Sequence, residues 1–239
     1  MNYPTLSIVI LCYKAGETAR VFVNKTITLL ENNGITNYQL ILVGNYKKNT
    51  NDPTPKIVAS LAKNNPNIDY IAKPKKGMMG WDMKCGLNKA QGDYVAIIDG
   101  DGQMPIEDLI KVFRIIKLKK LDLVKTYRVT RGDGFKRKTL SLFYNFFFNL
   151  FFPGMYSRDI NSKPKILTRK ACDMLKLKSN DWFIDAEIMI QARRYKFTIS
   201  EIPTNFLGLQ GSRKSFVGTT TIFEFIKNLI IYRIKEFFY

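Results

Sequence analysis

The chain has 239 residues, of which 38 are Lys or Arg, 20 are Asp or Glu and none is His, so its formal net charge is +18. The absence of His excludes Ser-His-Asp and Cys-His catalysis, His-ligated zinc and imidazole proton shuttles. An apolar content of 46% is too high for an intrinsically disordered chain, and the length fits one principal core. Any chemistry must therefore use carboxylates, amines, guanidinium groups or a metal ion.

The cysteines and the N-terminus carry information about the cellular compartment. Cys12, Cys85 and Cys172 are an odd number at wide spacing, without a CxxC pair, which favours free thiols in a reducing compartment. The N-terminus has no basic region followed by a long apolar stretch, so we expect no signal peptide. No apolar stretch reaches the length of about 20 residues that crosses a bilayer. We therefore expect the chain to face the cytoplasm.

Strand and helix patterns alternate over residues 1–127. Continuous apolar and β-branched runs predict buried strands at 6–12, 38–43, 68–72 and 93–98. Amphipathic stretches predict helices at 17–33, 55–63 and 81–90. This alternation is typical of βαβ units, so it predicts an α/β fold with a mostly parallel sheet flanked by helices, whose sites lie at the carboxyl ends of the strands.

The pattern becomes less regular after residue 127. Strands are expected at 166–168 and 197–203, and helices at 171–177 and 185–194. The tail at 222–239 is apolar over one broad arc that Arg233 interrupts. Such an amphipathic tail lies on a membrane, covers the core or meets a second chain.

A basic block is followed by an aromatic run. Residues 111–140 hold eleven basic and two acidic side chains, which is half of the net charge. A block of this kind suits nucleic acid, an anionic membrane surface or a phosphorylated substrate. In the run at 142–152, Asn145 and Asn149 share one face of a helix and leave a broad aromatic face opposite. The run predicts either a core helix or a helix lying in the plane of a membrane surface.

The most informative stretch is 92–105, where a buried strand ends in several oxygen-bearing side chains. Asp99 and Asp101 are two residues apart, and Gln103 follows at the same spacing. A divalent cation at this strand exit would bridge protein and phosphate oxygens. The alternative is a polar turn, because Asp-Gly is a strong turn dipeptide.

Further motifs follow one another in a fixed order along the chain. They are 7–10, 80–86 with 90–95, 99–107, 159–164 with 168–169, 185–187, 201–203 and 211–215. In order and spacing they resemble the motifs of the inverting, metal-dependent family 2 glycosyltransferases of GT-A fold. Within that family they are most similar to the dolichyl-phosphate mannose synthase-like group, which glycosylates polyprenyl phosphates. At 163–164 this chain has Lys-Pro where that group has Gly-Phe.

The resemblance implies a role for each matching position. It implies that Mg²⁺ or Mn²⁺ is held by Asp99, Asp101 and Gln103, and that Asp101, Asp185 and Arg131 are catalytic. The positions implied to bind the nucleotide-sugar are Leu11, Tyr13, Glu17, Gly44, Asn45, Gly80, Lys84, Asp99 and Gly100. The positions implied to bind the acceptor or its phosphate are Arg128, Arg131, Asp159, Ser162, Arg213 and Lys214.

The acceptor decides what Asp185 would do. A sugar hydroxyl needs a carboxylate base, whereas a polyprenyl phosphate needs none and would leave Asp185 to orient the sugar or basic side chains.

The chain also departs from the family pattern. Residues 43–45 read Val-Gly-Asn where the family has an Asp pair that helps to hold base and ribose, and residues 12–15 replace its first-loop Thr-Tyr-Asn-Glu. These departures leave the donor base unidentified by the sequence.

The expected function is transfer of a sugar from a nucleotide-sugar to a polyprenyl phosphate by a peripheral enzyme on the cytoplasmic face of a membrane. We expect a GT-A domain at 1–215, with a donor half at 1–127 and an acceptor half at 128–215, and an amphipathic helix at 216–239. Alternatives are transfer to a saccharide, a catalytically silent membrane scaffold and a basic nucleic-acid-binding protein. No nucleic-acid-binding module is recognised, so we expect no nucleic-acid partner. A homo-oligomer remains an open alternative.

Overall fold

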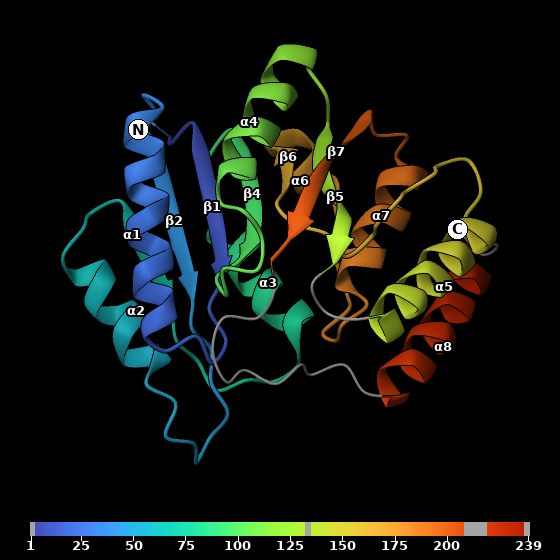
Figure 1. The fold of residues 1–239 in the computed structure, drawn as a ribbon, viewed down its shortest axis with the longest axis horizontal. Coiled ribbons are helices and arrows are strands. Elements are labelled where there is room, and N and C mark those ends of the chain that lie inside the picture. The colour runs from blue at the N-terminus through green and yellow to red at the C-terminus, as the bar shows by residue number, and fades with distance from the viewer. Residues whose placement is uncertain (1–2, 132–134, 208–218, 237–239) are drawn as a thin grey trace.

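A single sheet forms the centre of the computed structural model, which describes residues 3–131, 135–207 and 219–236 (Figure 1). Its strands are β1 (Leu6–Leu11), β2 (Tyr38–Val43), β3 (Ile68–Ile71), β4 (Tyr94–Asp99), β5 (Leu123–Arg131), β6 (Lys165–Thr168) and β7 (Ile199–Phe206). They lie in the order β3-β2-β1-β4-β6-β5-β7. Only β6 runs antiparallel to its neighbours, which confirms the expected mostly parallel sheet.

Helices follow most of the strands. They are α1 (Glu17–Asn32), α2 (Thr54–Lys63), α3 (Met79–Leu87), α4 (Glu107–Lys119), α5 (Phe135–Phe151), α6 (Arg169–Met174), α7 (Ile184–Arg194) and α8 (Thr219–Glu236). The expected helices are confirmed within a few residues. The expectation named neither α4 nor β5, which lie largely within the basic block at 111–140.

Helices cover both faces of the sheet, as the packing of β1 shows. Successive side chains of a strand point to opposite faces. Ile8 and Ile10 join one core with α1, α2 and α4, whereas Val9 joins a second core with α3 and α7. Since both faces are buried, β1 and β2 have no exposed residue, and they are apolar apart from Ser7 and Gln39, which hydrogen-bond to each other.

Helices α5 and α8 lie side by side at one end of the sheet (Figure 1). The core-helix alternative for the aromatic run holds in part, because Phe148 and Phe152 are fully buried while other apolar side chains of α5 are exposed. The rings of Tyr144 and Phe225 stack between the two helices with centroids 3.3 Å apart. Within the described part of the chain, no helix is both long enough and apolar enough to span a membrane.

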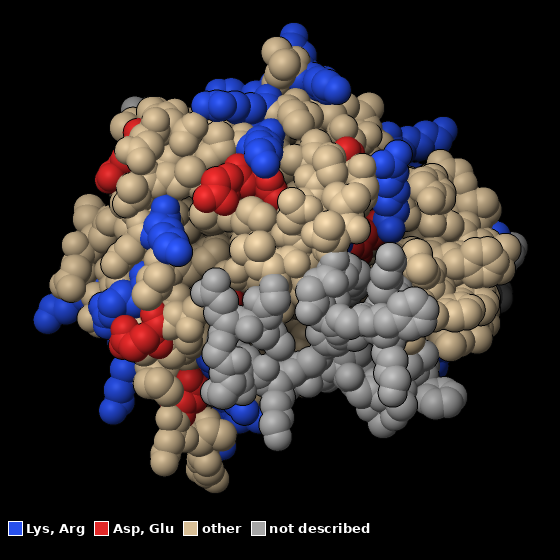
Figure 2. Space-filling model, viewed as in Figure 1, with Lys and Arg blue, Asp and Glu red and all other residues tan. Residues whose placement is uncertain are grey.

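The described side chains of the basic block do not gather on one surface. Helix α4 returns from the carboxyl edge of the sheet to the edge where β5 begins, so Lys117, Lys119 and Lys120 lie at the edge opposite the strand ends. Figure 2 shows basic side chains at the top of the view, where α4 ends in Figure 1. Lys125 of β5 is fully buried. Because the chain reverses direction between α4 and β5, basic side chains that are close in the sequence lie at different places in the structure.

Candidate functional site

The carboxyl ends of β1, β2 and β4 meet at one edge of the sheet. Their last residues, Leu11, Val43 and Asp99, are in register. The chain leaves this edge through tight turns, and a Cβ on Gly44 would lie 2.7 Å from a side-chain carbon of Val58, so glycine is favoured there. The structure therefore brings together the predicted site residues that follow these three strands.

A turn with several oxygen-bearing side chains follows β4. The Asp99 side chain is 31% exposed, and the N–H of Gly100 donates to β1. Gly102 has a φ of 74°, a left-handed conformation that favours glycine. Oδ1 of Asp101 accepts a hydrogen bond from the backbone N–H of Gln103 at 3.0 Å. Asp99, Asp101 and Gln103 therefore leave one strand end together, as the sequence predicted.

The side chains of this turn suit a hard divalent cation. Carboxylate and amide oxygens are ligands that Mg²⁺ and Mn²⁺ favour. Nε2 of Gln103 is buried and has no hydrogen-bond partner among the described residues, but this nitrogen is a donor, so only the amide oxygen of Gln103 can serve as a ligand. The described ranges contain no group of three or more His, Cys, Asp or Glu side chains able to hold a metal. A cation at the turn would take further ligands from water or a bound anion.

Asp185, near the start of α7, is fully buried between two buried lysines. Its Oδ2 accepts from Nζ of Lys163 at 3.0 Å, and its Oδ1 accepts from Nζ of Lys165 at 2.5 Å. Nζ of Lys163 also lies 3.3 Å from Oδ2 of Asp99. The sequence analysis assigned no role to either lysine. The available signal was the presence of two lysines spaced by two, one just before β6 and one at its first residue.

Electrostatics keep Asp185 ionised. Burial by itself would raise the pKa of Asp185, but the charges of Lys163 and Lys165 outweigh it and lower that pKa. Burial lowers the pKa of Lys165 to about 8, because the attraction of Asp185 offsets it only in part. Burial also opposes the charge of Lys163, yet Asp185 and Asp99 together raise its pKa. Asp185 therefore neutralises buried lysines, and each of its oxygens already accepts a hydrogen bond from an ammonium group.

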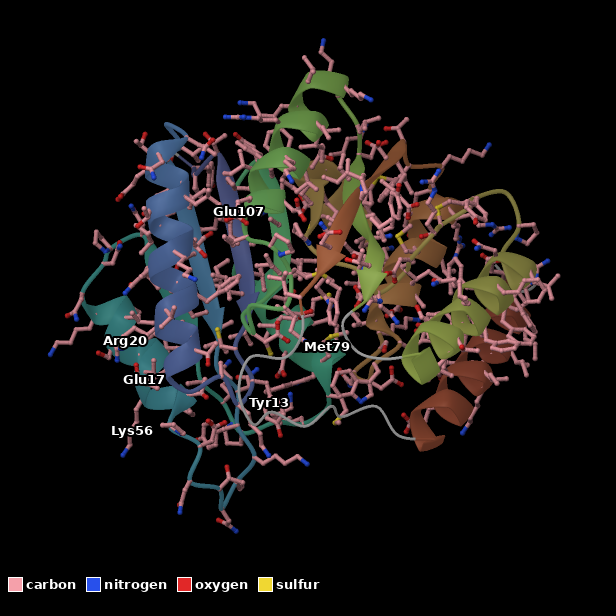
Figure 3. The ribbon with its side chains drawn as sticks, in the orientation of Figure 1. Tyr13, Glu17, Arg20, Lys56, Met79 and Glu107 are labelled. Carbon is pink, nitrogen blue, oxygen red and sulfur yellow. The ribbon has the colours of Figure 1, made fainter. Side chains whose placement is uncertain are left out.

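A second polar cluster lies beside the end of β2. Asn45 is fully buried, its Nδ2 donates to Oδ1 of Asp82 at 2.9 Å, and its Oδ1 accepts from the N–H of Lys73 at 2.9 Å. Lys75 forms an ion pair with Asp82, and its Nζ lies 4.2 Å from the ring centroid of Tyr13. Tyr13 lies at the edge where the strands end (Figure 3). A carboxylate does lie beside β2, but Asp82 of α3 supplies it.

Three predicted donor positions make contacts elsewhere. Glu17 begins α1, is 69% exposed and pairs with Arg20 at 2.8 Å (Figure 3). The N–H of Gly80 and Nζ of Lys84 donate to backbone carbonyls of the segment 178–181, each at 2.9 Å. Gly80 and Lys84 therefore fix α3 against the segment that precedes α7.

Three of the predicted acceptor residues, Arg128, Asp159 and Ser162, lie on or beside β5. Nε and Nη2 of Arg128 bind Oδ2 and Oδ1 of Asp159 at 2.6 and 2.8 Å. Burial would raise the pKa of Asp159, but Arg128 outweighs it and lowers that pKa to about 2. The hydroxyl of buried Ser162 lies 2.7 Å from that of Thr126. The side chain of Arg131, together with Arg213 and Lys214, lies outside the described part of the structure.

The mostly parallel α/β sheet with an Asp-x-Asp turn after its central strand has the GT-A fold. The chain belongs to glycosyl transferase family 2, whose family model matches residues 7–178. The expected fold and enzyme class are thus confirmed.

Relatives and solved structures agree with this class. A dolichyl-phosphate beta-glucosyltransferase of Trichomonas vaginalis is 25% identical over 246 residues, covering 96% of this chain and 74% of the relative. Another from Dictyostelium discoideum is 25% identical over 189 residues, covering 74% and 57%. Glucosyl-3-phosphoglycerate synthase from Mycobacterium tuberculosis, crystallised with Mn²⁺, UDP and glucosyl-3-phosphoglycerate, has a TM-score of 0.67 at 16% identity, covering 95% of this chain and 77% of that protein. At 16% identity, this structural similarity shows a shared fold.

Proposed function

We propose that this glycosyltransferase moves a sugar from a nucleotide-sugar to a polyprenyl phosphate, with inversion at the anomeric carbon. The relatives named for dolichyl phosphate favour this acceptor class. The observation that carries the proposal is the burial of Asp185 between Lys163 and Lys165. A saccharide hydroxyl must lose a proton during attack, whereas a phosphate oxygen is already anionic. An Asp185 whose two oxygens both bind lysine suits the phosphate acceptor.

At the donor end, we assign Asp101, Gln103 and Asp99 to the donor diphosphate and a Mg²⁺ or Mn²⁺ ion. When bound, that ion stabilises the charge that develops on the departing nucleoside diphosphate. The strand-end positions assigned to the nucleotide are Leu11, Tyr13, Gly44 and Gly100, with Asn45 acting through Asp82. Gly80 and Lys84 act by placing α3, and exposed Glu17 has no assigned contact with the donor.

At the acceptor end, we assign Arg128 to the lipid phosphate. A guanidinium group makes paired hydrogen bonds to phosphate oxygens, and Asp159 already fixes the plane of this one. Arg131, Arg213 and Lys214 are further candidates for the same phosphate. This assignment keeps the division into a donor half at 1–127 and an acceptor half at 128–215, with the C-terminal helix at 216–239.

The acceptor class is tested with radiolabelled nucleotide-sugars and Mn²⁺. Label should enter a chloroform-extractable, acid-labile product when undecaprenyl or dolichyl phosphate is added, because the phosphate oxygen needs no base. Free polyprenol, which ends in a hydroxyl, is the matched control acceptor and should give no product. Label that enters only a water-soluble saccharide would contradict the proposal and favour surface polysaccharide synthesis.

We further propose that α5 and α8 hold the enzyme on an anionic membrane surface as a peripheral protein. Several apolar side chains of α5 are each about 60% exposed, namely Leu142, Phe143, Phe146 and Leu150. On α8, the side chains that are 39–51% exposed include Ile226, Ile230 and Ile234. An apolar helix face of this kind fits the boundary between headgroups and acyl chains. The same surface would give access to a lipid acceptor from the cytoplasmic face.

Membrane binding is expected to depend on this apolar face. The double substitution Phe143→Ser and Phe146→Ser should weaken binding to phosphatidylcholine–phosphatidylglycerol vesicles by at least about tenfold, because each buried Phe contributes about 1.5–3 kcal/mol. Co-sedimentation at fixed lipid concentration measures the change. Leu118→Ser removes an apolar side chain that is 82% exposed on α4 and should leave binding unchanged. Equal losses in the two variants would point to non-specific adsorption.

A further inference from the structure

The segment 157–160, between α5 and β6, is mostly buried although it forms neither a helix nor a strand. Buried backbone N–H and C=O groups need hydrogen-bond partners, which such a segment cannot take from a regular ladder. Side chains supply them here. Nζ of Lys125 donates to the carbonyl of Asp159, and Nζ of Lys165 donates to the carbonyl of Ile160.

Helix α5 supplies further partners through two amide side chains. Nδ2 of Asn149 donates to the carbonyl of Ser157 at 3.0 Å, and its Oδ1 accepts from the N–H of the same residue at 3.1 Å. Oδ1 of Asn145 accepts from the N–H of Ile160 at 3.0 Å. Both amides lie on one face of the helix, since they are four residues apart. Helix α5 therefore holds the segment at both of its ends, with Asp159 between them.

Asp159 in turn fixes Arg128. Its two carboxylate oxygens bind Nε and Nη2 of the guanidinium group at 2.6 and 2.8 Å. Because the backbone that carries Asp159 is bound to α5, the place of this guanidinium group depends on the helix. A second face of α5 carries the exposed Phe143 and Phe146, which we place on the membrane. One helix therefore contacts both the acceptor end of the site and the proposed membrane surface.

We propose that Asn149 and Asn145 are positioning residues for the acceptor, because they tie the Asp159–Arg128 pair to the helix that we place on the membrane. The inference rests on the proposed function for its acceptor, the lipid phosphate. Arg128 then meets that phosphate at a place set by α5. A misplacement of about 1 Å costs about 10²-fold in rate, so loss of this link has a measurable effect.

The test is Asn149→Leu, which removes both hydrogen bonds to Ser157 and keeps a side chain of similar shape. The KM for undecaprenyl phosphate in phosphatidylcholine–phosphatidylglycerol vesicles should rise by at least about tenfold, because Arg128 is no longer held in place. The KM for the nucleotide-sugar should change by less than about twofold, since the donor end is distant from the substitution. Co-sedimentation with the same vesicles should be unchanged, which separates positioning from membrane attachment.

Asn33→Leu is the matched control. Asn33 also makes two hydrogen bonds, to the carbonyl of Leu29 and from Nη2 of Arg114, each at 2.8 Å, but it lies at the C-terminal end of α1. Both KM values should stay within about twofold of the wild type. In an Arg128→Gln background, Asn149→Leu should raise the KM for undecaprenyl phosphate by less than about threefold, because no guanidinium group is left to position.

The order of Arg128 is measured without substrates. Nitrogen relaxation NMR gives the order parameter of its Nε–H, which should be about 0.85 in the wild type and below about 0.6 in Asn149→Leu. Comparison with the spectrum of Arg128→Lys assigns the signal. A guanidinium group that stays rigid in Asn149→Leu would overturn the inference.

The kinetic results can also overturn it. They do so if the KM for undecaprenyl phosphate is unchanged in Asn149→Leu, if both KM values rise equally, or if vesicle binding is lost in parallel. A wild type that transfers no sugar to undecaprenyl phosphate contradicts the proposed function instead, and the order parameter then decides whether α5 fixes Arg128.

Circular dichroism checks that the variants fold. If Asn149→Leu does not fold, Asn149→Asp takes its place, because it keeps the oxygen that accepts from the N–H of Ser157 and removes only the donor. The loss of one hydrogen bond should still raise the KM for undecaprenyl phosphate by at least about threefold, and an unchanged value would count against the inference.

Discussion

Replacing Asp101 with Asn is expected to lower the rate of sugar transfer by about 10²- to 10³-fold. Asp101 lies in the turn after β4, where its Oδ1 accepts from the N–H of Gln103. An Asn side chain keeps that acceptor and therefore the turn, but it removes the negative charge offered to the divalent ion. The loss should fall on catalysis, and the thermal unfolding midpoint should remain close to that of the wild type.

Initial rates with a radiolabelled nucleotide-sugar, a polyprenyl phosphate and saturating Mn²⁺ measure this effect. Asp69→Asn is the control, because Asp69 is 38% exposed and pairs with Lys89 on the surface, so its transfer rate should stay within about twofold. An unchanged rate in Asp101→Asn would remove Asp101 from the chemistry. An absence of transfer in the wild type itself would favour the silent membrane scaffold over the enzyme.

The parts of the fold that the sequence predicted well are those in which burial is continuous. Every residue of β1 and β2 is buried, so their apolar runs are unambiguous, and the turn after β4 keeps its oxygen-bearing side chains local. The strand β5 was not predicted, since it carries Lys125 and Arg128 within a basic block. Glu201 and Asp159 pair with these two side chains, and a single sequence does not reveal partners that distant in the chain.

The site shows the same limit. Asp185 could be named from its motif, but its environment depends on Lys163 and Lys165, which lie about 20 residues away. Likewise, the missing carboxylate after β2 is replaced in space by Asp82, which the sequence places on a helix that follows β3. Lysine is rarely buried without a partner, so its burial becomes predictable only once the partner is known.

Replacing Asp185 with Asn is expected to lower the free energy of unfolding by about 3–5 kcal/mol at pH 7. The carboxylate is the shared partner of Lys163 and Lys165, and all three side chains are buried. An Asn leaves two buried ammonium groups without a neutralising charge between them. The double variant Asp185→Asn with Lys165→Met should recover part of the loss, because it removes one of these charges.

The pH dependence of this loss distinguishes uncompensated charge from poor packing. A lysine whose folded-state pKa lies below its ordinary value of 10.5 binds fewer protons when folded, so its burial cost falls as pH rises toward 10.5. In the wild type Lys165 behaves in this way, with a pKa of about 8, whereas Lys163 has a raised pKa and loses stabilisation at high pH. In Asp185→Asn both lysine pKa values should lie below 10.5, so the loss of unfolding free energy is largest at pH 7 and shrinks toward pH 10.

Urea unfolding of wild type and variant at pH 7, 8.5 and 10 measures this loss of stability. The control is Asp173→Asn, whose side chain is 62% exposed and whose replacement should be neutral. A deficit independent of pH would mean that Asp185 contributes by packing alone.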